Sequence, residues 1–599
     1  MSAGGGAARP GPALAVLALC AAAFVAAAFL LNREGGFWSP DSALRYVQVE
    51  SLLRSGFRDA SVPYPAAELD PAGRFFPASA WFHFRREGRD YLSYPPYFPA
   101  ASAVPYRIFG HYGLIALPVL GGLLAVWATA AALRRLAPEL AAWGAAAVGL
   151  ATPLLVYSGL FWDHSLAAAL AAGAFAFAAV TLARGEEAPP RALLAAGALL
   201  GLGFWLRNEM YLLAAAVGMA WFATCAPRQR AGVVPLAVGA ALAALPAWLM
   251  NLRLFGHPMG WKAPGLVAGR SAEVAQAVTG TGTAGWLAER GANLYHVLFA
   301  LDFATIFADA PGIPPQAVTA GLLVGGFLVA AAWLFRAGVR RQAQRLLAAG
   351  ALAAAAGVLL AVSGRTPLAG LLPTVPLVVL VALPARWHRW QRFVAVAGAA
   401  YVTAVVVAGS HAGLQWGPRY LLPVVPPLVW LAAVAVRDAR AAAPALWPSL
   451  RVSTGIVAAL GVLVQVSGLD HVSTVTTNNV RALAVVRSAP SDVVASAIGY
   501  LLMSAGPLYF EKRLMLVDTI EDLEALVRAL AEHRVPEWTY VPRSGPDFDP
   551  RVVAGWTAPD GWRYLPVRDR LPYANLRVVT FRAAALPRAD GAIERDGGR

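Results

Sequence analysis

Long apolar runs recur through the first 470 residues of this 599-residue chain, and they constrain its fold more than any other feature. Each run has about 16 to 22 residues, enough for a helix to cross a hydrocarbon core of about 30 Å. A helix satisfies its backbone hydrogen bonds internally, so such runs can lie in a membrane. The sequence therefore predicts an all-α polytopic membrane bundle of about thirteen transmembrane helices. The predicted spans are 13–31, 113–133, 139–157, 165–183, 191–206, 210–226, 231–250, 316–335, 345–362, 368–384, 393–409, 420–436 and 452–468.

The composition supports a membrane protein. Hydrophobic residues make up 58% of the chain and charged residues only 14%. A soluble protein of this composition would carry more apolar surface than its core could hide, so that class is excluded. The net charge of +15 would indicate a nucleic-acid partner in a polar chain, but here most basic residues lie between the apolar runs. Cys20 and Cys225 both lie inside apolar runs, which excludes a disulfide framework and a zinc site.

Arginine is distributed unevenly over the short loops that join the spans. If the N-terminus is cytoplasmic, that side carries seventeen arginines, whereas the short loops of the other side carry three. Because cytoplasmic loops are enriched in Lys and Arg, the sequence predicts a multi-pass cell-membrane protein with a cytoplasmic N-terminus. The seventeen are Arg9, Arg134, Arg135, Arg184, Arg191, Arg228, Arg230, Arg336, Arg340, Arg341, Arg345, Arg386, Arg389, Arg392, Arg437, Arg440 and Arg451, and the three are Arg207, Arg365 and Arg419.

This orientation leaves three long segments outside the cytoplasm. Two are loops of the predicted transmembrane module 1–469, at 32–112 and 251–315, and the third is the C-terminal segment 470–599. That segment alternates short apolar runs with a helical pattern over 520–532, which predicts a small extracytoplasmic α/β domain. The first span has no convincing cleavage site and is interpreted as an anchor.

Ionisable residues at the outer face are the candidates for a site, because a charge near hydrocarbon is costly to keep there. Asp41 follows the first span, and Pro40-Asp41-Ser42 is a helix-start signal. The residues after it place an apolar stripe on one side of the expected helix, which favours a helix lying on the membrane surface. Asp41 is either a plain N-cap or a general base held at the lipid–water boundary.

A second candidate lies in the short loop before the span 165–183. Asp163 and His164 form a compact polar pair beside Phe161 and Trp162. Sugars bind well to such a combination, because the ring packs on an aromatic face while its hydroxyls bond to a carboxylate. Capping of the following helix is the alternative role for Asp163.

A third candidate is the run Gln415-Trp416-Gly417-Pro418-Arg419-Tyr420, with His411 just before it. Arg419 lies on the side where arginine is rare. A guanidinium can form bidentate hydrogen bonds with a phosphate, so a lipid phosphate is the expected partner of Arg419. Arg207 with Glu209 is similar but is more easily an internal ion pair. Anchoring at lipid headgroups is the alternative for both arginines.

Other chemistry has little support in the sequence. The segment 32–112 is dense in aromatic residues and prolines, which is typical of an interfacial belt, although some could line a sugar or acceptor cleft. There is no Gly-rich phosphate loop and no serine nucleophile elbow. We therefore expect no cofactor, and the spacing of ligand-type residues does not support a divalent metal.

These residues resemble the motifs of membrane-embedded GT-C glycosyltransferases, in particular the bacterial branch of glycosyltransferase family 39, the dolichyl-phosphate-mannose protein mannosyltransferase-like family. The layout, with an external C-terminal domain, is similar to that of the aminoarabinose transferases. The resemblance covers the first 270 residues best, together with the last few spans. The motifs that carry it are Asp41 with Tyr46, Tyr94-Pro95-Pro96-Tyr97, Phe161-Trp162-Asp163-His164, and Gly417-Pro418-Arg419-Tyr420.

The resemblance implies a polyprenyl-phosphate sugar donor and transfer on the extracytoplasmic side. It implies that Asp41 is the catalytic base, that Asp163, the acid of the second outer loop, is a further catalytic-site residue that helps to orient acceptor or sugar, and that Arg419 is the candidate for binding the donor phosphate. The acceptor would be a lipid, a glycan or a protein, with membrane lipids as further partners and no nucleic acid. The protein-modifying branch typically has an Asp-Glu pair where this chain has Asp41-Ser42, which disfavours a protein acceptor. The predicted substrate-binding residues are Tyr46, Tyr94, Trp162, His164, Arg207, Glu209, Arg419 and Tyr420.

The physics of the reaction agrees with these roles. Attack by an acceptor hydroxyl at the anomeric carbon needs removal of a proton and stabilisation of a phosphate leaving group, with inversion expected. A carboxylate and a guanidinium would supply these two functions. A transporter or flippase is the main alternative, but we see no paired halves with interrupted helices. A ligase that moves a whole glycan from a pyrophosphate lipid, and an inactive membrane scaffold, are further alternatives.

Overall fold

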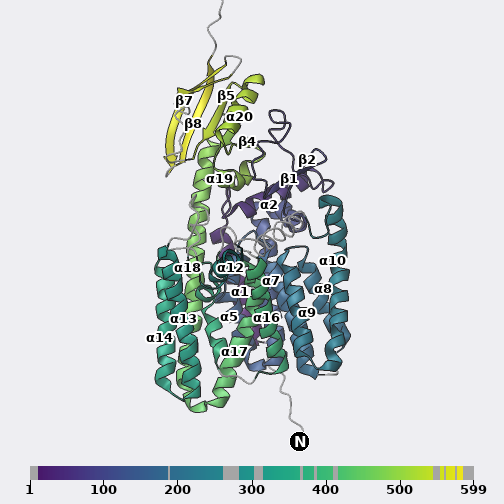
Figure 1. Cartoon of the computed structure of the whole chain (residues 1–599), viewed down its shortest axis with the longest axis vertical. Coiled ribbons are helices and arrows are strands. Elements are labelled where there is room, and N and C mark those ends of the chain that lie inside the picture. The colour runs from purple at the N-terminus through teal and green to yellow at the C-terminus, as the bar shows by residue number, and fades with distance from the viewer. Residues whose placement is uncertain are drawn as a thin grey trace, which may run out of the picture. The chain divides into compact units, whose positions relative to one another are not determined.

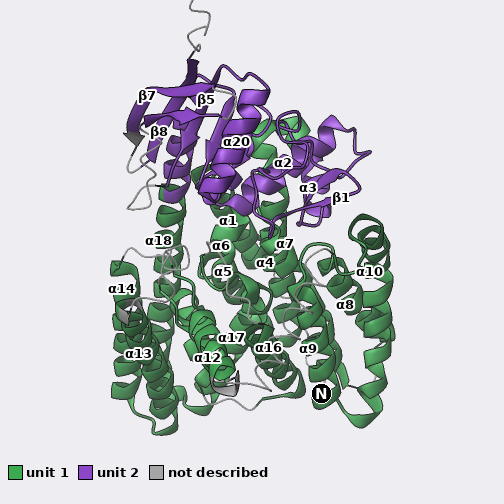
Figure 2. Cartoon of the chain, turned by 45° about the horizontal axis from the view of Figure 1, so that its top comes forward, with its two compact units in different colours: residues 1–32, 104–474 green, residues 33–103, 475–599 purple. Residues whose placement is uncertain are grey.

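The computed structural model describes residues 11–185, 189–260, 282–301, 315–364, 368–383, 387–408, 416–543, 554–558, 562–573 and 576–584. The chain divides into two compact units, shown in different colours in Figure 2. Unit 1 contains residues 1–32 and 104–474, and unit 2 contains residues 33–103 and 475–599. Most of the predicted outer loop 251–315 lies outside the described residues.

Unit 1 is helical, and its long helices run side by side (Figure 1). Within the described residues, nine helical segments are long and apolar enough to cross a membrane. They are Gly11–Leu31, Tyr97–Leu136, His164–Arg184, Pro227–Phe255, Val318–Arg340, Gln344–Ser363, Arg389–Ala408, Arg419–Ala442 and Pro444–Arg487. Two shorter apolar helices, α8 (Pro190–Gly203) and α9 (Glu209–Thr224), lie at two further predicted spans. The multi-helix membrane architecture is confirmed, and the number thirteen stays a prediction.

Two predicted spans are interrupted in the structure. Residues 139–157 form α5 (Ala141–Leu150) and the short α6 (Leu154–Ser158), with Pro153 between them. In the other predicted span, 368–384, the described residues contain α15 (Leu371–Thr374) and the 3₁₀ helix η6 (Pro376–Ala382). Proline lacks the backbone N–H of a helix interior and clashes with the preceding turn, so an apolar run that contains it need not form one continuous helix.

Glycine permits close helix packing in unit 1. A Cβ on Gly197 or Gly201 of α8 would lie 1.9 or 2.2 Å from a carbonyl oxygen of α10 (Val233–Phe255), and one on Gly239 of α10 would lie 2.1 Å from the Leu194 oxygen. Small residues four positions apart let two helix backbones approach closely inside a membrane. The helices α8 and α10 therefore pack with their backbones in close contact at these glycines.

Unit 2 is built on a six-stranded sheet with the order β4-β3-β5-β8-β7-β6 (Figure 1). Strand β3 pairs in parallel with β4 and β5, and the remaining pairs are antiparallel. The strands are β3 (Val493–Ser496), β4 (Arg513–Leu516), β5 (Glu537–Val541), β6 (Trp556–Thr557), β7 (Arg563–Tyr573) and β8 (Leu576–Ala584). Helices α19 (Gly499–Ser504) and α20 (Ile520–Glu532) follow β3 and β4, so the predicted α/β character is confirmed.

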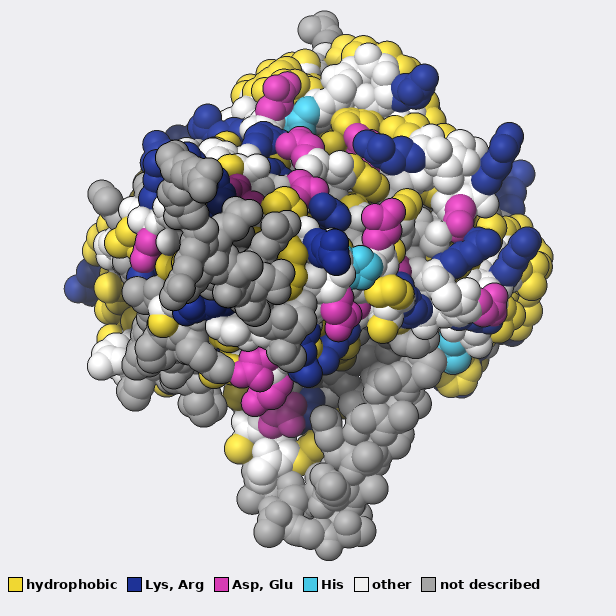
Figure 3. All heavy atoms as spheres, turned by 90° about the horizontal axis from the view of Figure 1, so that it is seen from above, with side chains coloured by type: hydrophobic (Ala, Val, Ile, Leu, Met, Phe, Trp, Pro, Cys, Tyr) yellow, Lys and Arg dark blue, Asp and Glu magenta, His cyan; other side chains and the backbone are white. Residues whose placement is uncertain are grey.

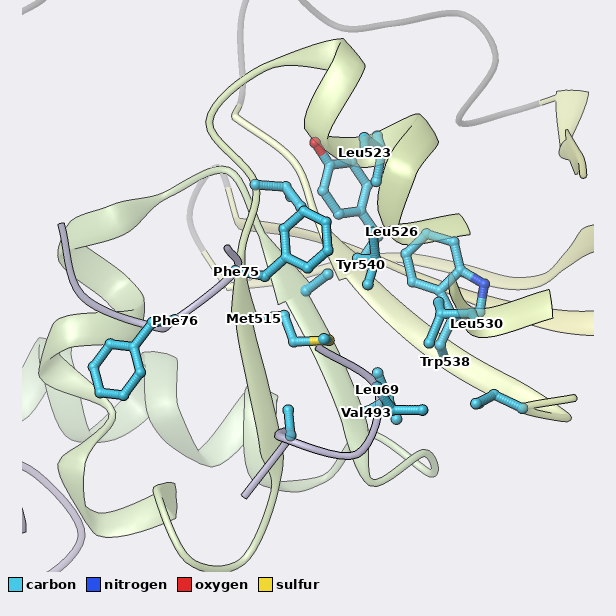
Figure 4. Close-up of a cluster of buried hydrophobic side chains, with 14 of the residues drawn as sticks. Leu69, Phe75, Phe76, Val493, Met515, Leu523, Leu526, Leu530, Trp538 and Tyr540 are labelled. Carbon is cyan, nitrogen blue, oxygen red and sulfur yellow. The ribbon is translucent and has the colours of Figure 1, made fainter. Parts of the chain in front are cut away.

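The N-terminal part of unit 2 shares the core of the sheet. Leu44 and Val47 of α2 (Pro40–Arg54) belong to the same buried cluster as Trp538 and Tyr540 of β5. Figure 4 shows Phe75 together with Met515, Leu526 and Trp538 in this cluster. The Leu516 backbone N–H also donates to the Phe75 carbonyl over 2.8 Å. The chain thus divides differently from the sequence-based division at residue 469, because long-range packing joins residues 33–103 to the C-terminal segment.

The face of the molecule in Figure 3 carries basic and acidic side chains interspersed with apolar ones. Unit 2 also contains ion pairs between Arg487 and Glu511, between Arg513 and Asp492, and between Arg582 and Glu537.

A buried carboxylate fastens the hairpin β1 (His83–Arg86) and β2 (Arg89–Leu92) of unit 2. The Asp90 carboxylate is 2.8 Å from His83 Nε2 and accepts two hydrogen bonds from Arg85, of 3.1 and 2.8 Å. Burial raises the pKa of Asp90, but the hydrogen bonds and positive charges of His83 and Arg85 outweigh it, so the pKa lies below its ordinary value. A carboxyl whose pKa is lower in the folded state stabilises the fold above its unfolded pKa, and that stabilisation is lost as the pH falls through the folded pKa.

Replacing Asp90 with asparagine is expected to lower the free energy of unfolding of unit 2 by about 1.5 to 3 kcal/mol at pH 7, because the buried carboxylate that accepts charge-assisted hydrogen bonds from Arg85 becomes a neutral amide. Hydrogen exchange of the β1 and β2 amides measures the effect in the full chain. The wild type should lose protection as the pH falls below about 4, and the variant should lack this part of the acid dependence.

The matched control is Asp59→Asn, since Asp59 pairs with Arg89 at a far more exposed position, with 34% and 62% of the side chains accessible. An exposed pair contributes about 0 to 1 kcal/mol. Equal effects of the two substitutions would contradict the stabilising role of Asp90.

Candidate functional site

The helix that carries Asp41 begins one step earlier than the sequence indicates. Ser39 has extended backbone angles and is the N-cap of α2, and its Oγ accepts a hydrogen bond of 3.4 Å from the Ser42 N–H. Pro40 occupies the start of the helix, where its missing N–H costs nothing. Asp41 lies in the first turn, near the positive end of the helix dipole, which favours an ionised carboxylate. The interpretation of Asp41 as a plain N-cap is therefore wrong, because Ser39 is the N-cap residue of α2.

A tyrosine from a distant part of the chain holds the Asp41 side chain. The Tyr94 hydroxyl donates to Asp41 Oδ1 over 2.5 Å, a length typical of a hydrogen bond to a charged acceptor. The guanidinium of Arg45 lies 4.3 Å from the centre of the Tyr94 ring and donates to the Asp41 carbonyl over 3.3 Å. Gln48 Nε2 donates to the Tyr94 carbonyl over 2.9 Å, which ties this tyrosine to α2. The structure thus brings Asp41 and Tyr94 together, within unit 2.

Tyr46, the other α2 residue predicted to bind substrate, is hydrogen-bonded to Glu50 of the same helix. Its hydroxyl donates to Glu50 Oε1 over 3.2 Å, one helical turn further along α2, and its ring lies 5.3 Å from that of Phe37. The apolar stripe of α2 differs from the expectation as well. Leu44 and Val47 are buried in the core of unit 2, so at these positions the stripe packs against protein.

In unit 1, Asp163 occupies the N-cap position of α7 (His164–Arg184), but its side chain makes no capping hydrogen bond. Its carboxylate instead accepts from Arg207 over 2.9 Å. Arg207 also donates to Glu209, so one guanidinium is shared by two carboxylates. The side chains of Asp163, Arg207 and Glu209 are only 2%, 12% and 8% accessible, which makes their charge balance important for the fold.

Aromatic rings surround this group of charges. His164 is buried, with its ring 4.8 Å from Trp162 and 5.0 Å from Tyr157, edge to face in both cases. Its Nε2 lies 3.4 Å from an Arg207 nitrogen. Trp162 stacks on Tyr157 with 5.6 Å between the ring centres. The predicted combination of acid, histidine and aromatic faces is therefore present as a compact arrangement.

Arg419 joins the same group from η7 (Arg419–Val424). Its guanidinium lies 5.4 Å from the Trp162 ring centre and 5.0 Å from that of Tyr420, and it donates to the Tyr420 hydroxyl over 3.2 Å. Arg207 lies 5.6 Å from the same Tyr420 ring. We call the set Trp162, Asp163, His164, Arg207, Glu209, Arg419 and Tyr420 the arginine cluster.

The turn before Arg419 is held by close contacts. Gly417 has a φ of +68°, and a Cβ there would lie 2.7 Å from the Pro153 side chain, so no other residue fits without strain. Its N–H donates to the Leu368 carbonyl over 2.6 Å. The short helices that interrupt the predicted spans thus lie against the segment that presents Arg419.

Several neighbours of these residues were not among the sequence-based candidates. Tyr157 lies inside an apolar run, and Tyr401 of α16 (Arg389–Ala408), whose hydroxyl donates to the Tyr420 carbonyl over 2.6 Å, lies inside another. A tyrosine in an apolar run carries no signal that separates it from ordinary membrane packing. His411 and Gln415 lie outside the described residues. No group of three or more His, Cys, Asp or Glu placed to hold a metal occurs in the described part of the chain.

No family model matches the chain, and no curated protein matches its sequence. Solved structures do match its fold. ArnT from Cupriavidus metallidurans bound to undecaprenyl phosphate is 15% identical, with a TM-score of 0.50 over 95% of this chain and 97% of that chain. The same protein in the apo state is 14% identical, with a TM-score of 0.49 over the same shares.

A more distant match is the archaeal oligosaccharyltransferase AglB from Archaeoglobus fulgidus, in complex with an inhibitory peptide and a dolichol-phosphate. It is 12% identical, with a TM-score of 0.39 over 88% of this chain and 69% of that chain. The match to ArnT extends over nearly the full length of both chains. The chain therefore has an ArnT-like fold, with a helical membrane part and a small C-terminal sheet.

Proposed function

We propose that this protein is an integral-membrane glycosyltransferase that transfers a sugar from a polyprenyl-phosphate donor to an acceptor hydroxyl, with inversion and with Asp41 as the general base. The observation that carries the proposal is the setting of Asp41: a carboxylate in the first turn of α2, not used as the cap, and hydrogen-bonded by Tyr94. The fold supports the reaction class, since ArnT has this fold and was crystallised with undecaprenyl phosphate.

The proposed step moves one proton and one glycosyl group. The acceptor hydroxyl loses its proton to the Asp41 carboxylate while its oxygen forms a bond to the anomeric carbon. The bond from that carbon to the phosphate oxygen breaks, and polyprenyl phosphate leaves with the electron pair. General-base help of this kind contributes about 10²- to 10⁴-fold to a rate. The Tyr94 hydroxyl would orient the carboxylate, so we assign Tyr94 a positioning role beside Asp41.

The roles proposed for the arginine cluster differ between its two arginines. Arg207 is engaged by Asp163 and Glu209, and we propose that it organises the cluster. Arg419 contacts the aromatic groups Trp162 and Tyr420, and we propose that it binds the donor phosphate, since a guanidinium pairs with phosphate oxygens in two directions. Asp163 and His164 with Trp162 would hold the sugar or the acceptor.

The uneven distribution of arginine supports a cytoplasmic N-terminus and an extracytoplasmic C-terminal part. In this orientation Asp41, Asp163 and Arg419 belong to extracytoplasmic segments. We propose a lipid or glycan acceptor ahead of a protein, because Ser42 stands where the resembling protein-modifying branch has an acid. No metal or cofactor is part of the proposal.

The stereochemistry of the product tests the mechanism. With one base and a single displacement, the sugar in the product has the anomeric configuration opposite to that of the donor. Nuclear magnetic resonance of the product formed from a donor of known configuration measures this directly. Retention of configuration would contradict a single displacement assisted by Asp41.

Replacing Arg419 with alanine is expected to raise the KM for the polyprenyl-phosphate donor by about 10-fold or more, while the KM for the acceptor changes little. A charge-assisted hydrogen bond contributes about 1.5 to 3 kcal/mol, and 1.4 kcal/mol is a factor of ten. The matched control is Arg437→Ala, in α17 (Val425–Ala442), where the arginine pairs with Asp438. Unchanged donor dependence in Arg419→Ala would leave Arg419 as a membrane anchor only.

A further inference from the structure

The C-terminal part of the chain holds the segment that leads into the Asp41 helix. Asn479, near the C-terminal end of α18 (Trp447–Arg487), donates from Nδ2 to the carbonyls of Phe37 and Trp38, over 2.9 and 3.0 Å. These are the two residues immediately before the N-cap Ser39. One amide therefore fixes the path of the backbone where α2 begins.

Two close contacts press the same region against C-terminal residues. A Cβ on Gly36 would lie 2.8 Å from the Val480 side chain and 3.2 Å from its backbone. A Cβ on Gly506, which begins η9 (Gly506–Leu508), would lie 2.5 Å from the Ala43 carbonyl in the first turns of α2. Backbone contacts this close leave no room for the start of α2 to shift, because protein interiors are packed without slack.

A second tyrosine lies within reach of the Asp41 charge. The side chain of Tyr500 in α19 is hydrogen-bonded to that of Asn479. Burial raises the pKa of Tyr500, and the negative charge of Asp41 acts in the same direction. Asn479 thus connects this neutral phenol to the carbonyls of Phe37 and Trp38 in one hydrogen-bonded network.

We propose that Asn479 and Tyr500 are positioning residues for Asp41, and that one role of the C-terminal part of the chain is to fix the place of this carboxylate for proton removal. The inference rests on the proposed function, because it assigns a purpose to holding Asp41. It adds a role for residues 475–599, in which neither the predicted motifs nor the candidate site residues lie.

The test compares Asn479→Ala with Asn478→Ala, its exposed neighbour on the same helix. Misplacing a catalytic group by about 1 Å can cost about 100-fold in rate, so we expect Asn479→Ala to lower kcat by about 10- to 100-fold with both KM values near those of the wild type. Asn478→Ala should have nearly wild-type kinetics. Equal kinetics of the two variants would overturn the inference.

A double-variant cycle separates positioning from a general loss of folded protein. In an Asp41→Glu background the carboxylate is already displaced, so Asn479→Ala should cost clearly less there than in the wild type. A loss of the same factor in both backgrounds would indicate only a structural role and would overturn the inference.

Tyr500→Phe gives a second measurement that leaves the packing of the ring intact. Its matched control is Tyr509→Phe, which also removes a hydroxyl hydrogen-bonded inside unit 2, to the Pro63 carbonyl at 3.0 Å. We expect Tyr500→Phe, and not Tyr509→Phe, to lower kcat at unchanged KM. Equal effects of the two would count against the role of Tyr500. If Asp41→Asn itself retained full turnover, the proposed function would fail, a result distinct from failure of Asn479→Ala alone.

Discussion

Replacing Asp41 with asparagine is expected to lower turnover by about 10²- to 10⁴-fold, because the acceptor hydroxyl loses its general base. The change should leave the fold intact, since asparagine has the same shape, Ser39 still caps α2, and an amide oxygen can still accept from Tyr94. Release of polyprenyl phosphate by the purified full chain measures turnover. Thermal unfolding in the same detergent verifies that the variant is folded.

The matched control is Glu50→Gln, which removes one carboxylate from the same helix α2. Glu50 accepts from Tyr46 and pairs with Arg54, whereas the Tyr94 hydroxyl donates to Asp41. Its variant should therefore turn over at nearly the wild-type rate. Near-normal turnover in Asp41→Asn, or an equal loss in both variants, would refute the base assignment.

The second large effect is on stability. Replacing Arg207 with methionine removes the cation that Asp163 and Glu209 share, and both carboxylates are buried. Removing one partner of a buried ion pair costs about 3 to 5 kcal/mol, because a charge is left without compensation. We therefore expect Arg207→Met to lower the free energy of unfolding by about 3 to 5 kcal/mol, measured by thermal or denaturant unfolding in detergent.

A compensating variant distinguishes charge balance from lost packing. Combining Arg207→Met with Asp163→Asn and Glu209→Gln removes all three charges together, and most of the lost stability should return. Arg191→Met, at an exposed position at the start of α8, is the control and should change stability by less than about 0.5 kcal/mol. No recovery in the combined variant would show that Arg207 acts through packing of its side chain.

The helices were predictable where one physical quantity, apolar length, decides. The predicted span 165–183 matches α7, His164–Arg184, and the helix expected at 520–532 is α20 with the same limits. The number of spanning helices could not be predicted in the same way, because proline interrupts some of the apolar runs, as at Pro153 and Pro376. Hydropathy averages over such a run and does not register a lost backbone hydrogen bond.

The candidate site was predictable in its residues but not in its pairings. A charge at an apolar boundary is visible in the sequence, which identified Asp41, Asp163 and Arg419. Which groups meet depends on tertiary packing: Arg207 reaches Asp163 across 44 positions, and Tyr94 reaches Asp41 across 53. The local signal at α2 was also ambiguous, because Ser39 and Asp41 are both good capping residues and only the backbone angles decide between them.

The division of the chain was the least visible feature. Phe75 and Leu516 share a backbone hydrogen bond although they are far apart in sequence. The aromatic and proline-rich composition of residues 33–103 suits an interfacial loop as well as a packed core. The burial of Leu69, Phe75 and Phe76 in the cluster of Figure 4 shows that packing with the C-terminal sheet decides the outcome.

The most direct test of the proposed function uses the purified full chain in detergent with a panel of polyprenyl-phosphate sugars, and measures free polyprenyl phosphate. We predict release that depends on the protein and on an acceptor for at least one donor, and that Asp41→Asn suppresses. Absence of release with every donor, together with movement of a lipid-linked sugar across vesicles by the reconstituted protein, would contradict a transferase and indicate a transporter.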